Sequence, residues 1–139
     1  MKTYFKNFLL CGLTGWCIEC AYTGFTQLLQ GNIKMTSTTS IWMFPIYGLA
    51  VFIIPVYSGI KNLHIFIRAW IYGVLIMSVE FITGSLLSLI DGCPWDYHYA
   101  AMNYNGLIRL DYFPLWMIAG LIFELLLCHR ELIKNKLRH

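Results

Sequence analysis

Charged residues are scarce in this sequence. Of its 139 residues, 12% are charged and 58% are hydrophobic, whereas a soluble domain carries roughly 25% charged residues. A chain with so little charge cannot hide its apolar surface in water. The composition therefore excludes an ordinary water-soluble domain and predicts a protein whose solvent is lipid.

Several motifs of enzymes are also absent. The chain contains no G-x-x-x-x-G-K-[ST], so it is not itself a P-loop ATPase, and it contains neither G-x-S-x-G nor H-E-x-x-H. Its 4 histidines are too scattered to predict a metal site from spacing. We predict no metal and no other cofactor, and we leave enzymatic activity open while favouring a non-enzymatic role.

Four long windows hold almost no charge. Between Lys6 and Lys34 the only charged residue is Glu19, and the three windows that follow contain at most one glutamate each. Each window is long enough for the roughly 20 residues that cross a hydrocarbon core. Backbone groups must be paired there, so each window is expected to be helical. The sequence predicts an all-α membrane protein, a single domain over residues 1–139, built as a bundle of four transmembrane helices at about residues 5–29, 41–59, 65–90 and 112–128.

Lysine and arginine are distributed unequally between the two sides of this arrangement. Of the 10 such residues, 8 fall on one side and only Lys34 and Arg109 fall on the other. Cytoplasmic loops are enriched in positive charge. We therefore predict a multi-pass protein of the cell (plasma) membrane with both its N- and C-termini in the cytoplasm.

Residues 91–111 form the one long connection between the predicted helices, and we call them the cap segment. The cap segment is rich in aromatic and polar side chains, among them Trp95, Asp96, Tyr97 and His98. Loops this long are usually functional or disordered, and so many aromatic residues argue against disorder. We predict an ordered outer loop between the third and fourth helices.

Glu19 and Glu80 are the leading candidates for chemistry. An acid near the centre of a membrane helix costs about 2.5 to 3.5 kcal/mol on insertion scales and is a functional candidate by default. A rise of about 1.5 Å per residue from the predicted inner ends places both acids somewhat past the midplane, so that they are expected to meet. Two carboxyl groups in one apolar site would hold a proton or a cation between them. The alternative is that both acids only join helices by hydrogen bonds.

Two further features are interpreted as structural. Glu124 lies in the inner half of the fourth predicted helix, where it is expected to reach the interface or to pair with Arg130. Cys17 and Cys20 form a C-x-x-C in mid-helix, beside an acid that opposes the thiolate. We interpret most of the 5 thiols as small hydrophobic residues rather than as redox groups.

Five motifs occur in a specific order along the chain. Together they resemble the family of ABC-transporter permeases of the CmpB type, to which vertebrate transmembrane protein 229 is similar. The resemblance spans nearly the whole chain from Gly15 to Trp116. The motifs are GWCIE from Gly15, WMFPIYG from Trp42, EFITG from Glu80, WDY from Trp95, and NYNG from Asn103 followed by Leu110.

The resemblance implies a permease-like protein with a shared site. The residues that it implies for this site are Glu19, Pro45, Tyr47, Gly48, Glu80, Thr83, Gly84, Trp95, Asp96 and Tyr97.

The predicted function is transporter-like binding of a small polar or cationic ligand, or a proton, in an outward-facing acidic and aromatic pocket. The acids would neutralise the charge, and Trp16, Tyr47 and Trp95 would supply cation–π walls. The expected partners are membrane lipid, the ligand, and a second copy of the chain or a larger transporter complex, with no nucleic acid. The predicted ligand-binding residues are Trp16, Glu19, Tyr47, Glu80, Thr83, Trp95, Asp96 and Tyr97.

Two other functions stay open at this point. One is a membrane-embedded enzyme acting on a lipid headgroup, with Glu80 or Asp96 as general acid or base. The other is an accessory subunit of a larger membrane complex in which the acids are structural.

Overall fold

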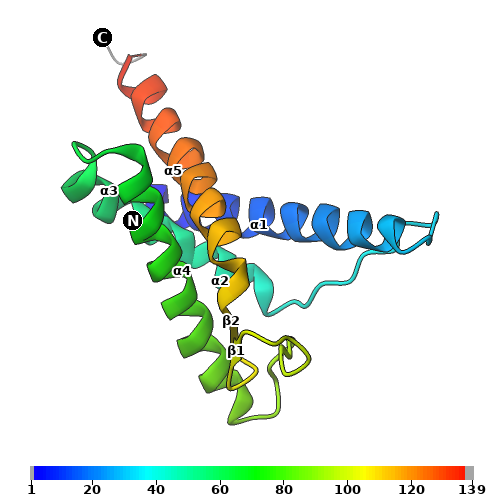
Figure 1. The fold of residues 1–139 in the computed structure, drawn as a ribbon. Helices are drawn as coiled ribbons and strands as arrows, with labels where there is room; N and C mark the ends of the chain where they lie inside the picture. The colour runs from blue at the N-terminus through cyan, green and yellow to red at the C-terminus, as the bar shows by residue number, and fades with distance from the viewer. Residues whose placement is uncertain (1, 137–139) are drawn as a thin grey trace. The chain divides into compact units, whose positions relative to one another are not determined.

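A computed structural model describes the backbone of residues 2–136 and the side chains of residues 2–128. The helices are traced in Figure 1. Two 3-10 segments, η1 (Leu49–Phe52) and η2 (Leu110–Tyr112), and two short strands, β1 (Asn103–Tyr104) and β2 (Ile108–Arg109), lie between them. The helices are α1 (Lys2–Leu29), α2 (Met43–Gly48), α3 (Ile53–Ile60), α4 (Ile65–Ser88) and α5 (Phe113–Lys136).

The described residues contain 4 helical segments that are long and apolar enough to cross a membrane. This confirms the predicted all-α membrane protein with four spans. The outer position of the cap segment and the orientation of the termini stay predictions. The segments are Lys2–Leu29, Met43–Ile60, Ile65–Ser88 and Leu110–Cys128.

The chain divides between Val51 and Phe52 into two compact units, each of which is described here by itself. In the first unit α1 packs against α2 at glycine residues, whose lack of a side chain leaves room for the neighbouring helix. A Cβ atom on Gly15 would lie 2.2 Å from Cγ of Tyr47, far inside van der Waals contact. Small residues thus allow these two helices to approach closely. The single domain predicted for the whole chain stays a prediction.

In the second unit α4 and α5 run antiparallel and in contact. Gly73 faces Phe113, and a Cβ atom on Gly120 would lie 2.3 Å from Cβ of Tyr72. Tyr72 is fully buried at this crossing. The close approach brings the polar side chains of the two helices within hydrogen-bonding distance of one another.

The cap segment belongs to the second unit and is held together by its own backbone. The N–H of Tyr97 donates to the carbonyl oxygen of Gly106 at 2.9 Å. β1 and β2 pair in antiparallel fashion around a turn in which Asn105 and Gly106 have φ angles of 52° and 66°. These left-handed conformations suit asparagine and glycine. The backbone of the cap segment therefore has a defined conformation from which its side chains project.

Two helices differ from the prediction. The second predicted helix, about 41–59, is interrupted by η1, because Pro55 has no N–H to offer the carbonyl of Val51 and its ring crowds that turn. The fourth was expected to end near residue 128, but α5 continues to Lys136. Residues 129–136 contain no glycine or proline, so their charges indicate where the helix leaves lipid and not where it ends.

Candidate functional site

The predicted ligand-binding residues fall in both units of the chain. Three of them, Trp16, Glu19 and Tyr47, lie in the first unit, and the remaining ones lie in the second. The structure describes two clusters, and their combination into one pocket stays a prediction.

In the first unit, the chain that follows α1 folds back along this helix. The indole N–H of Trp16 donates to the carbonyl oxygen of Ser40 at 2.9 Å. The hydroxyl of Thr39 donates to Oε2 of Glu19 at 3.0 Å. Glu19 is half-buried and therefore already has a neutral hydrogen-bond donor from its own unit.

In the second unit, Glu80 is buried, with 9% of its surface exposed. Tyr97 belongs to the cap segment, and its hydroxyl donates to Oε1 of Glu80 at 3.0 Å. The described part of the chain contains two buried polar side-chain atoms without a hydrogen-bond partner, Oε2 of Glu80 and Nε1 of Trp116. A carboxyl group in a membrane span is thus bonded at one oxygen and unbonded at the other.

Trp116 of α5 is a neighbour of Glu80 that the sequence did not identify. Its indole N–H interacts with the Glu80 carboxyl group without reaching hydrogen-bond geometry. The ring of Tyr112 lies between the two aromatic neighbours, 6.0 Å from the ring of Tyr97 and 6.4 Å from that of Trp116, in edge-to-face geometry in both cases. The site around Glu80 is therefore lined by aromatic rings that present O–H and N–H donors.

Trp95 and Thr83 donate hydrogen bonds to backbone carbonyl oxygens next to this cluster. The indole N–H of Trp95 donates to the carbonyl oxygen of Leu107 at 2.9 Å. Its ring packs on Gly84, where a Cβ atom would lie 3.0 Å from Cζ2. The hydroxyl of Thr83 donates to the carbonyl oxygen of Val79 at 2.7 Å. Trp95 thus fixes the cap segment on α4, one turn from Glu80.

Asp96 lies at the surface of the cap segment, with 72% of its side chain exposed. The backbone N–H of His98 donates to Oδ1 of Asp96 at 2.9 Å, and Nδ1 of His98 lies 2.5 Å from the same oxygen. These hydrogen bonds hold the pKa of Asp96 below its usual value. Asp96 is therefore an exposed acid, whereas Glu80 is buried.

A second polar cluster joins α4 to α5, and the sequence did not predict it. Nη2 and Nε of Arg68 donate to the two oxygens of Glu124 at 2.9 and 3.1 Å, and the hydroxyl of Tyr72 donates to Oε2 at 2.6 Å. The expected partner of Glu124 was Arg130, whose side chain lies outside the described residues. The pair could have been predicted from the sequence, because Arg68 and Glu124 carry opposite charges at the same depth on two antiparallel helices.

Arg109 is the cation of the cap segment. It forms a bidentate contact with Asp111, with Nη2 2.8 Å from Oδ2, and its guanidinium group lies 4.2 Å from the centre of the Tyr112 ring. The hydrogen bonds to Asp111 raise the pKa of Arg109 further above its usual value. Arg109 is thus already paired, and it stabilises Tyr112 by a cation–π contact.

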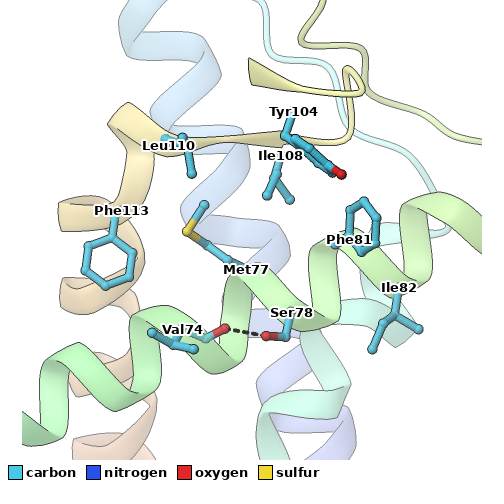
Figure 2. A pocket seen from close by; sticks show the side chains of 9 residues that line it. All are labelled: Val74, Met77, Ser78, Phe81, Ile82, Tyr104, Ile108, Leu110 and Phe113. Carbon is cyan, nitrogen blue, oxygen red and sulfur yellow. Dashed lines mark hydrogen bonds between the residues drawn. The ribbon is translucent and has the colours of Figure 1, made fainter. Parts of the chain in front are cut away.

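An open groove of about 510 Å³ lies along α4 beside the hairpin of β1 and β2. Figure 2 shows that its lining consists of aliphatic and aromatic side chains, and that Ser78 turns its hydroxyl back to the carbonyl oxygen of Val74, at 2.8 Å. None of the predicted ligand-binding residues lines it. An apolar groove on a membrane-spanning helix fits hydrocarbon rather than a polar ligand.

Comparison with known proteins gives a family for nearly the whole chain. The model of the family described as "Putative ABC-transporter type IV", the CmpB type, matches residues 6–137. No solved structure matches the chain. The match includes the cap segment and both clusters, while the similarity to vertebrate transmembrane protein 229 stays a prediction.

Proposed function

Because the chain belongs to the CmpB-type family of ABC transporters, we propose that it is a transporter-type membrane protein that binds a small cationic species at the Glu80 carboxyl group. The observation that carries this proposal is the unbonded, buried Oε2 of Glu80 inside a membrane span. A carboxyl group in this position is costly unless it has a partner or a function.

We also propose a binding role for Glu19 of α1, an acid within a candidate membrane span. Trp16 and Tyr47 of the first unit are the aromatic residues proposed to act with Glu19, and Trp95 of the second unit is the one proposed to act with Glu80. The hydrogen bond from Thr39 to Glu19 supports this role, because a neutral donor leaves the negative charge of Glu19 available.

The proposed setting is the plasma membrane, with both termini in the cytoplasm, and a second copy of the chain or a larger transporter complex as partner. The distribution of lysine and arginine supports the orientation. In each candidate span only 17 to 22% of the most apolar 18-residue window is buried within the chain. The spans therefore retain apolar surface for membrane lipid and for a partner.

The lowered pKa of Asp96 does not favour this residue as the general acid of an enzyme that acts on a lipid headgroup. A general acid must hold a proton near neutral pH, whereas the hydrogen bonds from His98 lower the pKa of Asp96. We therefore keep the binding role as the conclusion for this site.

Thermal unfolding in lipid nanodiscs tests the proposal. The unfolding midpoint is measured against pH and against rising concentrations of sodium and tetramethylammonium. A species that binds the folded state stabilises it by about 2.7 kcal/mol at about 100 times its dissociation constant. We expect at least one of the three to raise the midpoint of the wild type and to lose this effect in Glu80→Gln, with a weaker effect in Glu19→Gln.

Asp91→Asn is the matched control. It removes the same charge from an exposed acid of the cap segment, and asparagine tolerates the φ angle of 52° found at this position. This variant should respond like the wild type. If none of the three species moves the wild-type midpoint, or if Glu80→Gln responds fully, the proposed binding role is wrong.

A further inference from the structure

The oxygen of Glu80 that lacks a partner identifies what binds there. Oε2 is closed off from solvent and unbonded, while Oε1 accepts the hydroxyl of Tyr97 at 3.0 Å. Resting on the proposed function, we propose that the species bound at Glu80 is a proton, exchanged at Oε2, and not a metal ion or an organic ammonium ion.

Charge is the first reason. The ion pairs among the described side chains join Arg68 to Glu124, His98 to Asp96 and Arg109 to Asp111, and none of them includes Glu80. An ionised carboxylate in hydrocarbon without a counter-ion is the costly state of this group, and a proton on Oε2 removes the charge.

The chemistry of the neighbours is the second reason. A hard cation takes six or more oxygen ligands, but the groups directed at Glu80 are the O–H of Tyr97 and the N–H of Trp116, which are donors. The described residues contain no group of three His, Cys, Asp or Glu that could hold a metal ion. The hydrogen bond from Tyr97 to Oε1 can persist when a proton is added at Oε2, because the carbonyl oxygen of a protonated carboxyl group still accepts.

Space is the third reason. An organic ammonium ion needs a cavity, and the groove along α4, whose lining is mostly apolar, does not include Glu80. A proton needs no cavity beyond the oxygen itself. Tyr97 reaches Glu80 from the cap segment, so in this proposal the proton is exchanged on the side of the cap segment.

The other titratable groups around this site do not compete for the same proton. The cap segment and η2 contribute Tyr97 and Tyr112, and phenols ordinarily deprotonate only near about pH 10. Arg109, whose guanidinium group lies over the Tyr112 ring, is paired with Asp111. On α4 itself, Tyr72 and Arg68 are bonded to Glu124. His98 follows Tyr97 in the cap segment and contacts Asp96, but an imidazole gives no carboxylic-acid band. A carboxylic-acid band that titrates between about pH 5 and 9 in this cluster is therefore assigned to Glu80.

Infrared difference spectroscopy of the full chain in lipid nanodiscs tests the proposal, because the C=O stretching band of a protonated carboxyl group is separate from the bands of a carboxylate. Spectra are compared across about pH 5 to 9, the range in which ordinary exposed acids stay ionised. We expect a carboxylic-acid band that grows as the pH falls, shifts in D₂O, is lost in Glu80→Gln and is retained in Asp91→Asn.

Tyr97→Phe is a second variant that keeps the test decisive if Glu80→Gln does not fold. Loss of the hydroxyl removes the hydrogen bond to Oε1, so the frequency of the Glu80 band should shift while the band itself remains. A wild-type spectrum without a carboxylic-acid band across the range, or a band that Tyr97→Phe leaves at the same frequency, overturns the proposal.

The two proposals fail in different ways. If tetramethylammonium or sodium raises the unfolding midpoint through Glu80 and no carboxylic-acid band appears, cation binding stands and the proton is wrong. If the band titrates and belongs to Glu80, the proton is supported at this residue. If neither a carboxylic-acid band of Glu80 nor a shift of the midpoint with any of the three species appears, both proposals are wrong.

Discussion

Glu80 and Glu124 lie in the same pair of antiparallel helices, and each accepts a hydrogen bond from a tyrosine hydroxyl. Glu124 also receives two hydrogen bonds from Arg68, so that both of its oxygens are bonded. Among the described side chains, no cation pairs with Glu80, and one of its oxygens is unbonded. The rule that an acid in a membrane span marks a functional site does not separate the two residues. Their partners do, because a neutralised carboxylate is a structural cross-link and an unpaired one is not.

The same substitution at the two acids should therefore have very different effects. Glu124→Gln leaves Arg68, with 17% of its side chain exposed, without a counter-ion, and we expect a loss of about 3 to 5 kcal/mol in the free energy of unfolding. Reversible unfolding in mixed micelles measures it. The double variant Arg68→Met, Glu124→Leu should recover most of this loss, since it removes both charges together. A mild effect of Glu124→Gln alone would show that the pair is not a cross-link.

The two tyrosines extend the comparison. Tyr72→Phe removes a hydrogen bond to an ionised carboxylate and should cost about 1.5 to 3 kcal/mol. Tyr97→Phe removes one to an acid that we propose to be neutral, and should cost about 0.5 to 1.5 kcal/mol. The same unfolding assay at neutral pH measures both. Equal costs would contradict the difference in charge between the two sites.

The helix crossing beneath the ion pair offers a steric test. A Cβ atom on Gly120 would lie 2.3 Å from Cβ of Tyr72, so Gly120→Ala forces the helices apart and should cost about 1 to 3 kcal/mol. Gly59→Ala is the control, because nothing lies within 4 Å of its Cβ position. If both variants unfold at the same denaturant concentration, α4 and α5 do not depend on this close approach.

Glu80→Gln should change the stability by less than about 1 kcal/mol, because it breaks no ion pair and the amide oxygen can still accept from Tyr97. Its effect should instead appear in the response of the midpoint to pH. Unfolding curves recorded at several pH values compare this variant with the wild type. A large loss of stability at all pH values would make Glu80 a structural residue like Glu124.

The smallest effect is expected at Asp96, the exposed acid of the cap segment. Because its folded-state pKa is lowered by the N–H of His98, its contribution is fully present above the unfolded-state pKa and is lost as the pH falls through the folded-state value. The side-chain carboxyl carbon resonance of Asp96, followed by NMR from neutral to acidic pH, should move over that acidic window. A titration midpoint at or above the usual value of an aspartate would contradict this assignment.

The four spans could be predicted from charge alone, because lipid excludes charge and requires helical backbone. The end of α5 could not, since the position where a helix leaves the membrane differs from the position where its hydrogen bonds stop. The break at η1 was predictable in kind, because Pro55 lacks an N–H. The position of the break within the span, at Leu49–Phe52, depends on which backbone groups form the i to i+3 hydrogen bonds of the 3-10 turn. The sequence does not specify these groups.

Individual site residues could be predicted more readily than their partners. Glu80 and Tyr97 were found from sequence, and they are in contact. Trp116 and the pairing of Arg68 with Glu124 were missed, because both depend on the register of α4 against α5. That register depends on the contacts of Gly73 with Phe113 and of Gly120 with Tyr72. A single sequence does not reveal such contacts.

The boundary between the two units falls within η1, and η1 lies inside a candidate membrane span, Met43–Ile60. The units are therefore not joined by an aqueous linker of the kind that separates soluble domains. The chain instead passes from one unit to the next inside a candidate span, where its backbone groups must still find partners within the protein. The 3-10 turn of η1 therefore has to keep its hydrogen bonds next to a proline that cannot donate one.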